Sequence, residues 1–418
     1  MKVFERADFP QTREELSKDV IAGVTVAIVA LPLAIGFGIT SGMSASAGIA
    51  TAIVAGFIAA LLGGSRFQVS GPTGAMTVVL IPVIDKYGIA TIPVLGIMAA
   101  FVLLALALFK VGKYIKRVPE PVVEGFTVGI ALLIILQQAP YAFGVPKGSG
   151  ERTVLIALHT VQDAIRIGIH WQTLFVVALT LFIKCNIVKV LERFHIKAYV
   201  PASFSSLAIT SIVVIVFHLD VNRIGDIPRN VIAWAPPELS GASFSGLLIP
   251  ALSIAALSAI EALLAARVAD DLANVPKVRE FKPNQELVGQ GLATLATSFV
   301  GGMPSTGAIA RTGVNVRSHA TSRVSAMIHA LVLLIITLFL APIFSQIPTA
   351  AIAGVLIGTS FRIFNKATML EIFSSAKSNV VIFIVTATVT LAIDLIWGII
   401  AGVSAYFIAQ VLGKKFGK

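Results

Sequence analysis

Two polar stretches, rich in glycine, proline and hydroxyl side chains, interrupt this very apolar chain. The first runs from Ser70 to Thr77 and the second from Gly301 to Thr312, and each begins at or soon after a Gly-Gly pair that closes an apolar segment. A helix that begins inside a membrane leaves its first N–H groups without intrahelical partners. Its N-terminus also carries about half a positive charge. Two such helix ends that meet form an anion site from backbone alone, so the pattern predicts an anion-binding site between the stretches.

The predicted substrate-binding residues all belong to these two stretches. The glycines allow close backbone approach, the prolines are typical of helix starts, and the hydroxyls can cap a helix or bind a ligand. The alternative is a pair of kinked helices whose hydroxyls bond only to their own backbone. The predicted residues are Ser70, Gly71, Pro72, Thr73, Gly74, Ala75 and Met76 in the first stretch, and Ser305, Thr306, Gly307, Ala308, Ile309, Ala310 and Arg311 in the second.

Two charged residues lie in segments where a charge is costly. Arg311 follows the start of the second stretch, and a cation at the bilayer centre costs about 2.5–3.5 kcal/mol. It either supplies positive potential for the anion or extends to the cytoplasm. Glu261 lies in an apolar span, where it could carry a coupling proton or act as a static counter-ion to Arg311. Glu124 and Asp394, near span ends, are interpreted as structural.

The composition indicates a polytopic membrane protein. Of 418 residues 56% are hydrophobic and only 13% are charged, against roughly 25% in soluble domains. The net charge of +11 is explained by basic cytoplasmic loops, so no nucleic-acid partner is expected. A single cysteine excludes an internal disulfide and a cysteine-ligated metal cluster, and the six histidines show no ligand spacing. No cofactor, metal site or enzymatic motif is expected.

The apolar pattern predicts an all-α protein with about fourteen spans. Residues 152–167 are expected to form an amphipathic helix at the membrane interface instead. The predicted spans are 20–39, 45–62, 73–84, 90–109, 121–138, 171–192, 201–218, 244–268, 285–300, 306–318, 324–341, 349–363, 378–393 and 395–412, of which 73–84 and 306–318 are short.

Loop charges set the expected orientation. Basic residues gather in alternate loops, as at Arg66, Lys110, Arg317 and Arg323, while the intervening loops carry fewer. The positive-inside rule then places these loops, and both termini, in the cytoplasm of a cell-membrane protein.

An internal repeat is indicated by matching features in the two halves. Gly125-x-x-x-Gly129 and Gly354-x-x-x-Gly358 each lie two spans after a broken segment. Such spacing also occurs wherever membrane helices pack closely. Because seven spans per half invert the second half, we expect one transport domain over residues 1–418 with inverted repeats at about 19–219 and 244–412.

Several ordered motifs resemble those of the sulphate permease family, also called solute carrier family 26. They are Asp19 to Ala27 with Pro32, Ser70 to Thr73, Val118-Pro119 with Val122 and Gly125-Phe126, Asn284 to Leu287 with Gly289 to Gly291, and Thr306 to Thr312 with Asn315. The resemblance implies a seven-plus-seven inverted repeat with core and gate domains, an elevator-like movement and a homodimer. It also implies an anion site between the third and tenth spans, with Glu261 beside it.

The sequence departs from the family pattern in two ways. Members usually end in a cytoplasmic STAS domain, which is absent from these residues. Sodium-driven bicarbonate members carry an aspartate at Glu261 and a hydroxyl at Ala265, and an alanine gives sodium no side-chain oxygen. The leading hypothesis is therefore secondary active, proton-coupled symport of sulphate, bicarbonate or a dicarboxylate. Anion exchange and a passive anion channel are the alternatives, sodium-coupled bicarbonate uptake is less favoured, and Arg311 argues against a nucleobase permease.

Overall fold

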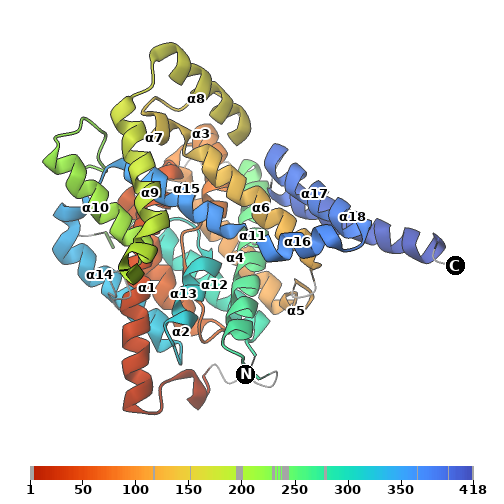
Figure 1. Ribbon diagram of the computed structural model, residues 1–418. Coiled ribbons are helices and arrows are strands. Elements are labelled where there is room, and N and C mark those ends of the chain that lie inside the picture. Colours follow the sequence, from red (N-terminus) through yellow and green to blue (C-terminus); the bar gives the residue numbers. More distant parts are fainter. Residues whose placement is uncertain are drawn as a thin grey trace. The chain divides into compact units, whose positions relative to one another are not determined.

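The computed structural model describes residues 4–115, 118–150, 152–193, 201–227, 231–232, 234–235, 237, 244–276, 280–364, 366–393 and 395–416. The fold is helical, with one short two-stranded sheet in the described part (Figure 1). Asp394, which is interpreted from the sequence as structural, lies outside the described residues.

A helix occupies every predicted span, which confirms the all-α membrane fold. The helices are α1 (Arg13–Thr40), α2 (Ala45–Leu62), α3 (Gly74–Tyr87), α4 (Ile92–Leu108), α6 (Glu120–Gln137), α9 (Trp171–Arg193), α10 (Ala202–Val216), α11 (Phe244–Leu272), α12 (Pro283–Ser298), α13 (Ile309–Arg317), α14 (Val324–Phe344), α15 (Thr349–Ile363), α17 (Lys377–Ala392) and α18 (Leu395–Phe416). By length and composition, seven helices in the described part can cross a membrane, one of them α6 extended through Phe143, and four more are shorter and apolar. The exact number of crossings stays a prediction.

The segment at 152–167 forms the expected amphipathic helix, α8 (Thr153–Ile167). Leu155, Leu158 and Ile165 are exposed on it, while Ile156 and Ala164 are buried. The sequence did not indicate the remaining short elements, because none is long enough to show a periodic pattern. These are η1 (Arg6–Asp8), η2 (Ile89–Thr91), α5 (Gly112–Ile115), α7 (Ala139–Phe143), α16 (Lys366–Ser374), β1 (Ser70–Gly71) and β2 (Thr306–Gly307).

The chain divides into two compact units. The first comprises Met1–Lys116 and Phe175–Val355, and the second Arg117–Leu174 and Leu356–Lys418. Within the first unit α12 packs on α4 and α2, α1 packs on α14 and α2, and α11 packs on α4 and α13 (Figure 1). Both strands and the two short helices α3 and α13 belong to this unit.

In the second unit the predicted Gly-x-x-x-Gly pair of α6 faces α17. A Cβ at Gly125 would lie 2.5 Å from the carbonyl oxygen of Phe383, and one at Gly129 would lie 2.6 Å from the methyl carbon of Thr390. Larger residues at these positions would therefore force α6 and α17 apart. The matching Gly354 of α15 lies close to α9 in the first unit, where a Cβ would be 2.8 Å from that of Thr180.

We predict that Gly129→Val destabilises the protein by about 1–3 kcal/mol, because it overpacks the contact between α6 and α17. Thermal unfolding of the purified protein in detergent measures the change. Thr127→Val is the matched control, since Thr127 is half-buried on the same helix and its hydroxyl bonds only to Val123 of that helix. Equal melting temperatures for the two variants would contradict the close packing.

Candidate functional site

The two polar stretches meet in a two-stranded antiparallel sheet. Ser70 pairs with Gly307, and Gly71 pairs with Thr306. The amide of Ala308 adds a further bond of 3.0 Å to the carbonyl oxygen of Val69. Each strand leads into a short helix, β1 into α3 and β2 into α13. The structure thus brings together the two segments that the sequence singled out.

The two short helices begin differently. The hydroxyl of Thr73 caps α3 by accepting from the amide of Met76 at 3.5 Å, and Gly74, Ala75 and Met76 are buried in its first turn. The prediction that the second helix starts soon after Pro304 is wrong. Strand pairing takes up the residues after Pro304, and α13 begins only at Ile309, after Ala308, which has no polar side chain to cap it.

The N-terminus of α13 is the more accessible of the two helix ends. Ile309 is 37% exposed and Ala310 is also exposed, whereas the residues from Thr73 to Met76 are buried. The first N–H groups of a helix lack intrahelical partners. Those of α13 therefore belong to the helix end that is less covered by other side chains.

Arg311 lies in the first turn of α13 and is 1% exposed. Its Nη2 donates to the carbonyl oxygen of Pro72, whereas its Nη1 has no hydrogen-bond partner among the described residues. A Cβ at Gly71 would lie 2.5 Å from Nη1, so the glycine makes room for the guanidinium. Arg311 is thus buried against the first stretch.

Glu261 approaches the same place from α11. Its Oε2 accepts from the hydroxyl of Thr73 at 3.1 Å. Thr73 directly follows Pro72 in the chain. The carbonyl that accepts from Arg311 and the hydroxyl that donates to Glu261 therefore belong to adjacent residues. Ala265, one turn further along α11, is fully buried and adds no side-chain oxygen.

The predicted hydroxyls of the second stretch are held by neighbouring helices. Thr306 donates to the backbone oxygen of Ser258 at 3.0 Å, and Ser258 donates back to the backbone oxygen of Ser305 at 2.9 Å. The hydroxyl of Ser305 lies 3.3 Å from that of Thr294 on α12. In this arrangement they fasten β2 to α11 and α12, and neither caps α13.

Buried polar residues of α12 hold the first stretch, and the sequence assigned them no role. Gln290 donates to the hydroxyl of Ser70 at 2.7 Å and to Glu286 at 2.9 Å. Glu286 also accepts from the amides of Gly64 and Ser65, at 2.8 and 3.0 Å. The family motif of Asn284 to Leu287 with Gly289 to Gly291, which contains both Glu286 and Gln290, was the available signal.

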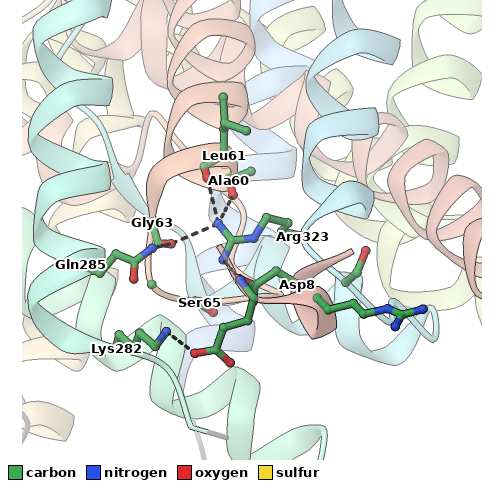
Figure 2. Close-up of polar contacts among 12 residues, drawn as sticks. Asp8, Ala60, Leu61, Gly63, Ser65, Lys282, Gln285 and Arg323 are labelled. Atoms are coloured by element: carbon green, nitrogen blue, oxygen red, sulfur yellow. Dashed lines mark hydrogen bonds and ion pairs between the residues drawn. The ribbon is translucent and has the colours of Figure 1, made fainter. Parts of the chain in front are cut away.

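Arg323 was expected in a basic loop, but it is 2% exposed and lies at the C-terminus of α2 (Figure 2). Its Nη1 donates to three carbonyl oxygens there, and its Nη2 forms an ion pair of 3.1 Å with Asp8. The three carbonyls belong to Ala60, Leu61 and Gly63. A cation at a helix C-terminus is favourable, so Arg323 fixes the end of α2 that leads into β1.

Two other buried polar side chains lie in this region. Gln68, two residues before β1, has no hydrogen-bond partner among the described residues, and His329 on α14 is fully buried. His329 lies against Gly56 of α2, next to the backbone of Ser70. The sequence signal for His329 was a single polar residue in an apolar span, which is a weak signal by itself, and Gln68 lies in a polar segment with Arg66 and Ser70. Glu124, predicted to be structural, is half-buried in α6.

Comparison with known proteins agrees with the fold. The model of the sulfate permease family matches residues 16–386. The chain belongs to the sulfate permease family. The putative sulfate transporter YvdB of Bacillus subtilis is 34% identical over 400 residues, which cover 94% of this chain and 73% of that protein. The bicarbonate transporter BicA of Picosynechococcus is 33% identical over 408 residues, covering 94% and 69%.

Solved structures of the family share the fold. The transmembrane domain of a cyanobacterial bicarbonate transporter BicA superposes with a TM-score of 0.83 at 29% identity, covering 93% of this chain and 98% of that one. The structure of SLC26A9 has a TM-score of 0.84 at 15% identity, covering 96% and 66%. As a sulfate permease family member the chain is a multi-pass membrane anion transporter and not an enzyme.

We predict that Thr73→Val lowers both stability and transport, because it removes the cap of α3 and the donor to Glu261. Loss of a threonine cap costs about 1 kcal/mol. Thr73→Ser keeps the hydroxyl and should stay close to wild type. Thermal unfolding and anion uptake into proteoliposomes measure the two effects, and identical behaviour of the valine and serine variants would refute the role of the hydroxyl.

Proposed function

We propose that the protein is a secondary active transporter that carries a small oxyanion together with protons. Sulphate, bicarbonate and dicarboxylates are the candidate substrates, and the relatives named for sulfate and bicarbonate support this class. The observation that carries the proposal is the buried guanidinium of Arg311, whose Nη1 has no partner among the described residues.

An anion beside Arg311 would resolve that unfavourable arrangement. A buried charged donor without an acceptor is costly, and an oxyanion supplies both an acceptor and a compensating charge. The adjacent N-terminus of α13, which has no side-chain cap, adds N–H groups that lack intrahelical partners and a positive helix dipole. Of the predicted residues, Ile309, Ala310 and Arg311 are therefore proposed to contact the anion, while the strand residues position them.

Glu261 is proposed as the proton-coupling residue. It lies on α11 beside the site and accepts a hydrogen bond from Thr73. The preceding residue, Pro72, accepts a hydrogen bond from Arg311. Protonation of Glu261 would remove a negative charge near the bound anion and so favour binding. Ala265 brings no oxygen for a hard cation, which disfavours sodium as the coupling ion.

An elevator-type movement is proposed for the transport step. Every proposed site residue belongs to the first compact unit, so the bound anion would travel as part of that unit. The proposal also includes inverted repeats at about 19–219 and 244–412, with core and gate domains. It places the protein in the cell membrane as a homodimer with both termini in the cytoplasm. Uphill accumulation of anion in proteoliposomes tests active transport, and strictly downhill flux would favour a channel.

We predict that Arg311→Ala weakens anion binding by roughly 10-fold to 100-fold, because the variant loses a charge-assisted hydrogen bond to the anion. Arg311→Lys should be intermediate, because it keeps the charge but not the forked donors. Arg317→Ala is the control, since Arg317 is exposed in the last turn of α13. Binding is measured by calorimetry on the purified protein, and an affinity unchanged in Arg311→Ala would remove Arg311 from the site.

We predict that Glu261→Gln abolishes stimulation of uptake by external acid while anion binding persists. The amide oxygen can still accept from Thr73, but the side chain no longer binds a proton. Uptake is measured in proteoliposomes over a range of external pH. Glu124→Gln is the matched control in another helix. Acid stimulation of normal size in Glu261→Gln would show that the coupling residue is elsewhere or that the protein exchanges anions.

A further inference from the structure

Gln68 is a buried amide that the fold leaves unsatisfied. It is 5% exposed, yet neither its Nε2 nor its Oε1 has a hydrogen-bond partner among the described residues. Buried polar groups are almost always paired, and an unpaired amide is unfavourable. The amide nitrogen can therefore donate to a further partner, and the amide oxygen can accept from one.

The amide lies against β2, one of the two strands of the candidate site. A Cβ at Gly307 would collide with Nε2 of Gln68, so the missing side chain of this strand residue provides the space for the amide. The same point lies 3.1 Å from the Cα of Ala262, which follows Glu261 on α11. Gln68 thus occupies the gap between β2 and α11, next to Ala308 at the start of α13.

We infer that Gln68 is a specificity residue that distinguishes a hydrogen-bearing oxyanion from a fully deprotonated one. The inference rests on the proposed anion site. In it, the amide nitrogen donates to a substrate oxygen and the amide oxygen accepts the substrate O–H. Arg311 cannot make this distinction, because a guanidinium only donates.

The two classes of anion satisfy this amide unequally. Hydrogencarbonate presents both acceptor oxygens and one O–H, so it can pair with both ends of the amide. Sulfate at neutral pH presents acceptors only and leaves Oε1 buried and unpaired. Sites built around a substrate hydroxyl discriminate strongly against an analogue that lacks it, because a buried polar group stays unsatisfied.

The test compares hydrogencarbonate and sulfate binding to the full-length purified chain. Gln68→Met keeps the length of the side chain but neither donates nor accepts as an amide does. Gln68→Asn keeps the amide on a side chain that is one methylene shorter. It replaces Gln68→Met in the test if the methionine variant does not fold. Gln137→Met is the matched control, because Gln137 of α6 is also buried with both amide atoms unpartnered among the described residues.

We expect Gln68→Met to raise the dissociation constant for hydrogencarbonate about tenfold or more and that for sulfate less than about threefold. Gln68→Asn should shift the ratio in the same direction by less, and Gln137→Met should leave it unchanged. Equal weakening of both anions, or unchanged hydrogencarbonate affinity, would overturn the role of Gln68 and leave the anion site standing. Failure of the wild type to bind either anion would instead overturn the proposed function.

Discussion

The structure depends on finding hydrogen-bond partners for the backbone N–H and C=O groups of two interrupted segments inside an apolar protein. In hydrocarbon every backbone N–H and C=O must find a partner within the protein. The chain meets this demand by pairing β1 with β2 in an antiparallel register, Ser70 with Gly307 and Gly71 with Thr306. Side chains of the second half also hold the residues that precede β1. Asn315 donates to the carbonyl oxygen of Phe67 at 2.8 Å, and the amide of Val69 donates to the hydroxyl of Thr312 at 3.1 Å.

This pairing also determines the chemistry of the site. It places the carbonyl of Pro72 where Arg311 can donate to it, and it leaves the second donor of the guanidinium without a partner among the described residues. The same pairing delays the start of α13 to Ile309, so that an uncapped helix N-terminus stands beside the charge. The position of the guanidinium beside this helix N-terminus therefore follows from the way in which the two segments join.

The sequence predicted the long helices and the meeting of the two polar stretches, but not the strand pairing and side-chain contacts that join them. Apolar runs define helix positions locally, and the interruptions marked both members of the sheet. The start of α13 was misplaced because a proline is typical of a helix start, whereas strand pairing depends on a partner more than two hundred residues away along the chain. For the same reason neither the burial of Arg323 at the end of α2 nor the link from Gln290 to Ser70 could be read from local pattern.

The contacts of the first unit support the proposed inverted repeat. Helix α1 packs on α14 and α13, and its proposed counterpart α11 packs on α4 and α3. These are exchanged pairs, which a two-fold relation between the halves would produce. The charges do not follow that relation, because Arg311 and Glu261 both belong to the second half while the first half contributes the hydroxyl of Thr73 and the carbonyl of Pro72. A symmetric framework would thus hold an asymmetric site, in which one half supplies the charge that attracts an anion and the other holds that charge in place.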